Sequence, residues 1–202
     1  MADSYNRKDH LYRKAKDEGL RSRAAYKLVE INAKFKLIGS SCKLIDLGAW
    51  PGGWLQVALK SMGPNGLAVG IDLVEIEDLD DPRLKLIVGD VRDDHNIESA
   101  LRISQGPFDV LLSDMSPKLT GIREVDQSAT LGLAELCFSV AKKLLRAEGH
   151  LVCKVFKGGE TDLFVKSLRP LFNKLVRTEL DSSRNTSNES YLVGLGYKPG
   201  YL

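Results

Sequence analysis

The chain has 202 residues, of which 43% are hydrophobic and 28% charged, and its formal net charge is +2. No apolar run approaches membrane-spanning length and no signal-peptide core is present, so we expect a soluble, cytoplasmic protein without membrane contact. Cys42, Cys137 and Cys153 are odd in number and form no C-x-x-C pair, which argues against a disulfide framework and a zinc site. This composition predicts one domain over 1–202. We expect a monomer without a metal.

Residues 1–23 form a basic N-terminal arm ahead of a core that we place at 24–202. The arm holds seven Lys or Arg residues against four acids, and Tyr5 and Tyr12 lie among them. The basic residues are Arg7, Lys8, Arg13, Lys14, Lys16, Arg21 and Arg23. A basic segment with aromatic side chains suits a phosphate backbone and stacked bases. A solvated, partly frayed terminus is the alternative from this stretch alone.

The rest of the chain alternates short apolar runs with amphipathic stretches. Apolar runs predict strands at 43–49, 66–73, 84–91, 108–115, 150–156, 174–180 and 191–197. Helical spacing of apolar residues predicts helices at 22–35, 53–62, 95–104, 126–149 and 160–172, with Pro170 distorting the end of the last one.

This alternation predicts an α/β fold of the Rossmann-like type, with a mostly parallel seven-stranded sheet and helices on both faces. A polar loop without a helix joins the last two predicted strands, so we expect one antiparallel strand there. In open sheets of this kind, ligands bind at the carboxyl ends of the strands, beside the switch point. We therefore expect the functional residues at those strand ends.

The first strand ends in a glycine turn, "DLGAWPGGW" (46–54). Gly48, Gly52 and Gly53 remove side chains at a strand-to-helix turn, so a ligand can approach the backbone and the helix N-terminus. Pro51 and the shifted glycine pair depart from the G-x-G-x-x-G of dinucleotide enzymes. A merely tight turn is the alternative interpretation.

Acidic residues end the next two predicted strands. Asp72 could accept hydrogen bonds from two ribose hydroxyls, and the Asp90 carboxylate could accept from the amino group of an adenine. Each acid alone could also be a helix cap or a solvated loop residue. Together with the glycine turn, they predict a nucleoside cofactor at the edge of the sheet.

The later strands add charged groups at the same edge. Asp114 ends the fourth strand in "LLSDMSP", and Lys154 lies within the apolar "GHLVCKVFKG" (149–158). Desolvating an ammonium is costly unless it is paired or loses its proton. A salt-bridged structural lysine is the alternative to a catalytic one. Taken alone, Glu189 at the start of the last strand would be an exposed acid, and Lys27 in the first helix would be a solvated lysine.

The chain resembles the FtsJ/RrmJ family of S-adenosylmethionine-dependent rRNA ribose 2′-O-methyltransferases. The motifs that match in order are "GLRSRAAYKL", "DLGAWPGGW", "GIDL", "LLSDMSP", "CKVFKG" and "SNESYLVG". The resemblance covers nearly the whole chain and implies a Rossmann-like fold. It places the family's catalytic Lys-Asp-Lys-Glu tetrad on Lys27, Asp114, Lys154 and Glu189. It places the cofactor contacts on Gly52, Trp54, Asp72, Asp90 and Asp114.

One residue departs from the family pattern. Trp50 stands where the family usually carries a small residue, and we interpret it as a packing change beside the cofactor loop. The compact chain is similar to the bacterial-type members that methylate a uridine of large-subunit (23S) rRNA. The resemblance therefore implies rRNA as partner, either free or in the assembled large subunit, with the anticodon loop of tRNA as the alternative substrate.

The chemistry of methyl transfer supports a catalytic role for Lys154. Methyl transfer to a ribose hydroxyl requires that the 2′-OH be oriented and its proton accepted. Lys154 could be that base, or it could remain charged and stabilise the developing alkoxide. A nicotinamide-dependent reductase is disfavoured by the missing G-x-G-x-x-G. A non-catalytic RNA-binding module is disfavoured because it has no need of Lys154 and Glu189 together.

Overall fold

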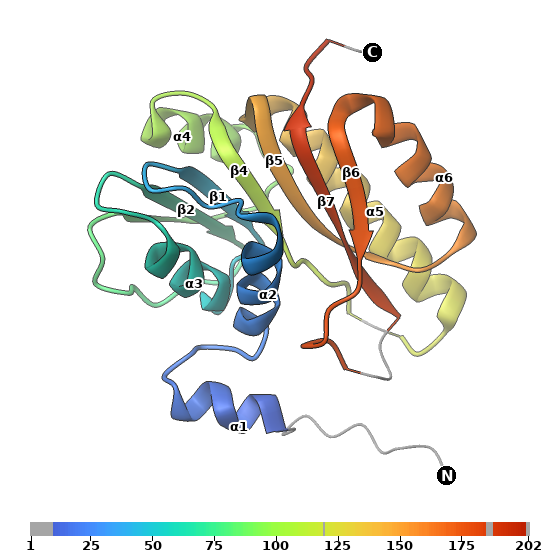
Figure 1. Cartoon of the computed structure of the whole chain (residues 1–202), viewed down its shortest axis with the longest axis horizontal. Helices are drawn as coiled ribbons and strands as arrows, with labels where there is room; N and C mark the ends of the chain where they lie inside the picture. Colours follow the sequence, from blue (N-terminus) through green and yellow to red (C-terminus); the bar gives the residue numbers. More distant parts are fainter. Residues whose placement is uncertain (1–9, 119, 185–187, 201–202) are drawn as a thin grey trace.

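A seven-stranded sheet forms the centre of the protein in the computed structural model, which describes residues 10–118, 120–184 and 188–200 (Figure 1). The strand order is β3-β2-β1-β4-β5-β7-β6. The strands are β1 (Lys43–Leu47), β2 (Leu67–Asp72), β3 (Leu84–Val88), β4 (Phe108–Ser113), β5 (Leu145–Phe156), β6 (Phe172–Thr178) and β7 (Glu189–Tyr197).

The pairing pattern confirms the predicted Rossmann-like sheet. β3, β2, β1, β4 and β5 pair in parallel, and β7 runs antiparallel to both β5 and β6. The antiparallel strand is inserted between β5 and β6 rather than added at an edge. Because successive strands depart from β1 in one direction and from β4 in the other, the switch point lies between these two strands.

Helices cover both faces of the sheet (Figure 1). The helices are α1 (His10–Asp17), α2 (Ala25–Phe35), α3 (Gly53–Ser61), α4 (Asp94–Ser104), α5 (Arg123–Leu144) and α6 (Gly159–Leu168). Strand side chains alternate between two cores because of the two-residue period of the pleat. Leu44 packs with α2 and α3, whereas Ile45 packs with α4 and α5. None of the helices in the described residues is long and apolar enough to cross a membrane.

Several element boundaries differ from those predicted. The helix expected at 126–149 spans Arg123–Leu144, and β5 begins at Leu145. Leu145 pairs with Phe108 of β4, and the register shifts between Phe108 and Val110. The apolar residues that continue the helical pattern are therefore used by the sheet, since tertiary pairing overrides local propensity.

The helix expected at 160–172 is also shorter. It ends at Leu168 and is followed by a 3-10 turn at Arg169–Leu171, which contains Pro170. β6 then begins at Phe172 rather than at residue 174. Pro170 lacks the backbone N–H that an α-helix needs at an interior position, so the tighter turn ends the helix there.

Candidate functional site

The carboxyl ends of the parallel strands surround a cavity of about 590 Å³, which we call the main cavity. Residues that end or follow β1, β2, β3 and β4 line it, together with two leucines of α5. Its acidic lining residues are Asp72, Asp90 and Asp114, and its apolar lining includes Val91, Met115, Leu133 and Leu136. This combination of apolar walls with a few polar groups is typical of small-molecule sites. The position agrees with the ligand site expected for an open α/β sheet.

The glycine turn after β1 brings backbone close to this cavity. Gly48 has φ +73°, and a Cβ there would lie 2.4 Å from the Met115 Cγ. Gly52 precedes α3 with φ +104°, a conformation that side chains rarely adopt. Both positions therefore favour glycine, because each has a positive φ and because Met115 leaves no room for a side chain at Gly48.

Asp72 lies in the lining and is fixed by the neighbouring backbone. Its Oδ2 accepts a hydrogen bond from the Trp50 N–H at 2.9 Å, and its Oδ1 accepts one from the Val74 N–H at 2.9 Å. A carboxylate has about four acceptor positions, so both oxygens retain capacity for a ligand. Asp72 is thus fixed in the cavity lining, and its role as a ribose acceptor stays a prediction.

Asp90 also lies in the lining, but it is paired with a neighbour. Arg92 donates from Nε to both Asp90 oxygens at 3.0 Å and from Nη2 to Oδ2 at 2.5 Å. These hydrogen bonds hold the pKa of the Asp90 carboxyl below its ordinary value. A ligand amino group at this carboxylate would have to share it with the Arg92 guanidinium.

Two predicted cofactor contacts are not brought into the main cavity. Gly52 and Trp54 belong to the start of α3 and are absent from the lining. The Trp54 side chain is 3% exposed, and its Nε1–H donates to the Ala24 carbonyl at 2.7 Å. The indole therefore packs α3 against the start of α2 and does not line the main cavity. Of the contacts predicted for this turn, the backbone N–H groups in the first turn of α3 are still candidates for binding a cofactor.

The register of the sheet places three residues of the next cluster in a row. Ser113 of β4 pairs with Cys153 of β5, so Asp114 and Lys154 follow side by side. Lys154 in turn pairs with Tyr191 of β7. The Lys154 Nζ lies 3.1 Å from the Asp114 Oδ1 and donates to the Asp114 backbone carbonyl at 2.7 Å.

Lys27 and Glu189 complete this cluster from a helix and a strand end. Lys27 shares the buried face of α2 with Leu28 and Ile31, and this face packs on the sheet. Its Nζ lies 2.7 Å from the Glu189 Oε1 and 3.9 Å from the Asp114 Oδ2. The structure thus joins Lys27, Asp114, Lys154 and Glu189 in one network, which we call the tetrad. Lys27 and Lys154 are only 8% and 6% exposed.

The two carboxylates of the tetrad are kept ionised by their neighbours. Burial alone raises the pKa of the Asp114 carboxyl, but the ammonium groups of Lys154 and Lys27 outweigh it and hold that pKa below its ordinary value. Burial likewise raises the pKa of Glu189, and the Lys27 ammonium beside it lowers the pKa further than burial raises it. Both carboxylates are therefore ionised at neutral pH.

Tyr191 is a member of this network that sequence reasoning did not identify. Its hydroxyl donates to the Asp114 Oδ1 at 2.6 Å, and the Lys27 Nζ lies 5.4 Å from the centre of its ring. Burial and the nearby Asp114 carboxylate raise the pKa of Tyr191 well above its ordinary value, so the hydroxyl stays a donor. Because side chains alternate along a strand, its place two residues after Glu189 was the available signal.

Asp46 was also missed, although it lies in the glycine-turn motif. It is 2% exposed in β1. Burial raises the pKa of its carboxyl well above the ordinary value, and the charges of Asp114 and Asp72 raise it further. Asp46, which is buried, and Asp114, which is partly buried, thus have opposite pKa shifts, because only Asp114 is held by lysines.

Two arginines of the predicted RNA-binding arm bind the protein itself. The Arg21 guanidinium donates to the carbonyls of Pro51, Glu77 and Asp78. Arg23 donates from Nη2 to the Ser182 carbonyl at 2.5 Å. These hydrogen bonds tie the end of the arm to loops of the protein, and RNA backbone contact by the two arginines stays a prediction.

The rest of the predicted arm divides into two parts. Residues 10–17 form the helix α1, which the sequence analysis did not predict. Arg13, Lys14 and Lys16 are exposed on it, and Ala15 is buried. Tyr5, Arg7 and Lys8 lie outside the described residues.

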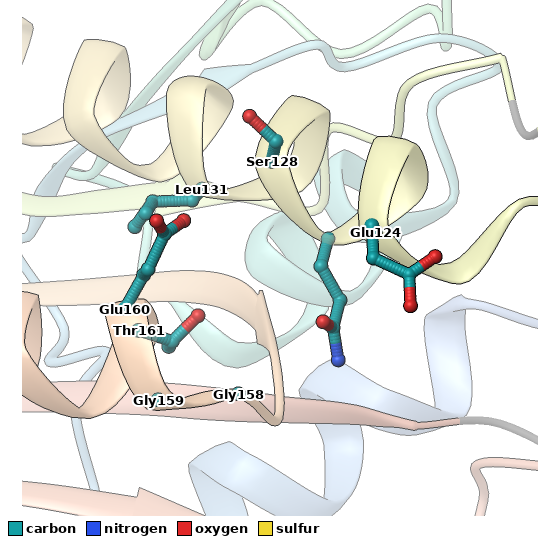
Figure 2. A pocket seen from close by; sticks show the side chains of 8 residues that line it. Glu124, Ser128, Leu131, Gly158, Gly159, Glu160 and Thr161 are labelled. Carbon is teal, nitrogen blue, oxygen red and sulfur yellow. The ribbon is translucent and has the colours of Figure 1, made fainter.

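A second cavity of about 310 Å³ lies between the starts of α5 and α6 (Figure 2). Glu124 and Ser128 of α5 and Glu160 and Thr161 of α6 are among the residues that line it. None of the residues predicted for the site lines this cavity. The tetrad and the main cavity, which share Asp114, are therefore the candidate active site.

The fold, the glycine turn and the acids at the strand ends define a Rossmann-like methyltransferase. The FtsJ-like methyltransferase family matches residues 20–197. The chain belongs to this family.

Individual relatives agree with this assignment. The chain is 42% identical to "Ribosomal RNA large subunit methyltransferase E" of Methanothermobacter thermautotrophicus, over 95% of this chain and 91% of that protein. It is also 42% identical to the protein of the same name from Coxiella burnetii, over 94% of this chain and 92% of the relative. A solved Plasmodium falciparum structure described as a ribosomal RNA methyltransferase superposes with a TM-score of 0.78 at 25% identity, covering 88% of this chain and 98% of the other.

Proposed function

We propose that the protein transfers a methyl group from S-adenosylmethionine to the ribose 2′-hydroxyl of a uridine in large-subunit (23S) rRNA. The observation that carries this proposal is the tetrad, in which Lys154 is held by Asp114 beside the main cavity. The relatives named for large-subunit rRNA support the choice of substrate. Similarity to such a relative extends over nearly the whole of both chains.

The main cavity suits S-adenosylmethionine in size and in chemistry. Its volume of about 590 Å³ is within the range of small-molecule sites. Asp72 can accept from the ribose hydroxyls and Asp90 from the adenine amino group, while Val91, Leu133 and Leu136 offer apolar surface. When bound, this donor supplies a methyl group that its sulfonium already activates. The protein therefore has to position the acceptor and manage one proton.

Lys154 is suited to bind the 2′-hydroxyl because its other contacts are fixed. An ammonium has three donor positions, and Lys154 directs two of them to the Asp114 carbonyl and carboxylate. The third position is left for the substrate. Lys154 acts either as the base that takes the 2′-hydroxyl proton or as the charge that stabilises the developing alkoxide.

The other tetrad residues position Lys154 and balance its charge. Asp114 contacts Lys154 directly and also lines the main cavity, so it connects the base to the donor site. Glu189 holds Lys27, whose ammonium lies 3.9 Å from Asp114. When Lys154 acts as the base, its neutral amine takes the 2′-hydroxyl proton and becomes an ammonium, so that two positive charges then balance the two carboxylates of the tetrad.

The test is methyl transfer from labelled S-adenosylmethionine to three RNAs, followed by nucleoside analysis. The RNAs are deproteinised 23S rRNA, assembled large subunits and tRNA, all from cells that lack the enzyme. We expect one 2′-O-methyluridine in 23S rRNA or in the subunit. Methyl transfer to tRNA alone, or a base-methylated product, would contradict the proposal.

A further inference from the structure

Trp50 is a large aromatic side chain exposed at the rim of the main cavity. It lines the cavity, and 56% of the residue is accessible to solvent. This differs from the packing change that we expected from sequence, because the indole is not packed into the core. The other tryptophan, Trp54, is 3% exposed and hydrogen-bonded.

Trp50 is part of an apolar mouth on this side of the cavity. Leu73, which is 68% exposed, also lines it. Leaving such side chains in water forgoes the free energy of burying their apolar surface. Contiguous exposed apolar surface at the mouth of a cavity marks a place that a ligand covers.

The backbone of Trp50 is tied to the acid predicted to bind ribose. Its N–H donates to the Asp72 Oδ2 at 2.9 Å, so the indole is carried by the same turn that orients this carboxylate. Of the tetrad, only Asp114 lines the main cavity, whereas Lys27, Lys154 and Glu189 do not. Trp50 therefore belongs to the donor side of the site rather than to the side of the target ribose.

We infer that the Trp50 indole packs against the nucleoside half of the bound methyl donor and covers the cavity mouth. The inference rests on the proposed function, because it takes S-adenosylmethionine as the occupant of the main cavity. An aromatic face suits the adenine or the apolar edge of the ribose, while Asp72 accepts from the hydroxyls. Trp50 is then a determinant of donor affinity and has no part in the chemistry.

The first test is calorimetry with S-adenosylhomocysteine, the demethylated product of the donor. Trp50→Ala should raise Kd by roughly 5- to 30-fold, the lower part of the range for aromatic stacking on a base. Trp50→Phe should keep Kd within about threefold because it retains an aromatic face. The control is Leu163→Ala, which removes a side chain that is 70% exposed on α6 and should leave Kd unchanged. Equal melting temperatures would exclude misfolding.

The second test uses the protein's own fluorescence, since Trp50 and Trp54 are its only tryptophans. S-adenosylhomocysteine should shift or quench the emission of the wild type and of Trp54→Phe. The same ligand should leave Trp50→Phe nearly unchanged, although calorimetry shows that it binds. A full spectral response in Trp50→Phe would overturn the inference.

The outcomes separate this inference from the proposed function. If the wild type does not bind S-adenosylhomocysteine, the proposed cofactor is wrong. If the wild type binds and Trp50→Ala binds equally well, only the role of Trp50 is wrong. If Trp50→Ala leaves this Kd unchanged but raises the KM for rRNA, Trp50 contacts the substrate RNA instead, which also overturns the inference.

Discussion

The tetrad and the main cavity lie at the same edge of the sheet and share Asp114, yet they balance their charges differently. In the tetrad, Lys154 contacts Asp114 and Lys27 contacts Glu189, and both lysines are buried. At the cavity, Asp72 accepts from two backbone N–H groups, Asp90 is paired with the exposed Arg92, and the apolar side chains of Trp50 and Leu73 are exposed. The charged groups of the tetrad are already paired with one another, whereas the cavity retains acceptor positions and exposed apolar side chains that a ligand could contact. We therefore expect substitutions in the two regions to affect different steps.

The largest effect should come from Lys154→Ala. We expect turnover to fall by about 10²–10⁴, the usual range for a positioned acid–base group. Donor binding should be unchanged, because the Lys154 side chain does not line the main cavity. Lys154→Arg should not restore activity, since a guanidinium keeps its proton and has a different shape. Methyl transfer to rRNA is the measurement.

The matched control for this substitution is Lys85→Ala. Lys85 is exposed on β3, away from the tetrad, and its removal should leave turnover unchanged. A loss in Lys85→Ala equal to that in Lys154→Ala would mean that any lost positive charge weakens the enzyme. The special role of Lys154 would then be wrong.

Asp72→Ala should produce the complementary effect. Removing a charged acceptor costs about 1.5–3 kcal/mol, so the Kd of S-adenosylhomocysteine should rise by roughly 10- to 150-fold. The rate at saturating donor should fall far less than in Lys154→Ala. Calorimetry measures the first quantity, and Glu75→Ala, in the exposed part of the same loop, is the control. An unchanged Kd would remove Asp72 from the donor site.

Tyr191→Phe should lower the stability of the protein more than it lowers the rate of methyl transfer. The substitution removes the hydroxyl that donates to Asp114 at 2.6 Å, and a hydrogen bond to a charged group contributes about 1.5–3 kcal/mol. The free energy of unfolding from urea titration should fall by about that amount. Turnover should fall less than in Lys154→Ala, because both lysines still hold Asp114. Unchanged stability would show that this hydrogen bond adds nothing to the tetrad.

The smallest effect should be a pH dependence of stability. The pKa of Asp114 and that of Glu189 are lowered in the folded protein, so their stabilisation is present above the ordinary values of 3.8 and 4.5. It is lost as the pH falls through the lower, folded values. The stability difference between wild type and Glu189→Gln should therefore shrink as the pH falls from 6 toward about 3. A difference that grows on acidification would contradict the assigned shift.

The sequence predicted most of this site because the strand ends carry its residues. Asp72, Asp90 and Asp114 end or follow their strands as expected, and the register of β4 and β5 brings Asp114 beside Lys154. The mostly parallel seven-stranded sheet also agrees with the alternation of strands and helices, whereas the strand order was not predicted. The sequence therefore predicted which charged groups lie at the ends of the strands.

What the sequence did not show is where side chains point and what they contact. Trp54 was expected at the cofactor, but its indole is buried between two helices. The hydrogen bonds from Arg21 to three backbone carbonyls of distant loops were not predicted either. Tyr191 resembled an ordinary apolar strand residue until β7 was placed beside β5. Such contacts depend on packing between distant segments, which local patterns do not encode.

The most direct test of the division between the tetrad and the main cavity is one crossed measurement. The single-turnover rate of rRNA methylation at saturating donor and the Kd of S-adenosylhomocysteine are determined for wild type, Lys154→Ala and Asp72→Ala. We predict that Lys154→Ala loses about 10²–10⁴ in rate with Kd unchanged, and that Asp72→Ala loses mainly affinity. A Lys154→Ala protein that methylates rRNA at the wild-type rate would contradict the account, because Lys154 would then be only a structural ion-pair partner of Asp114.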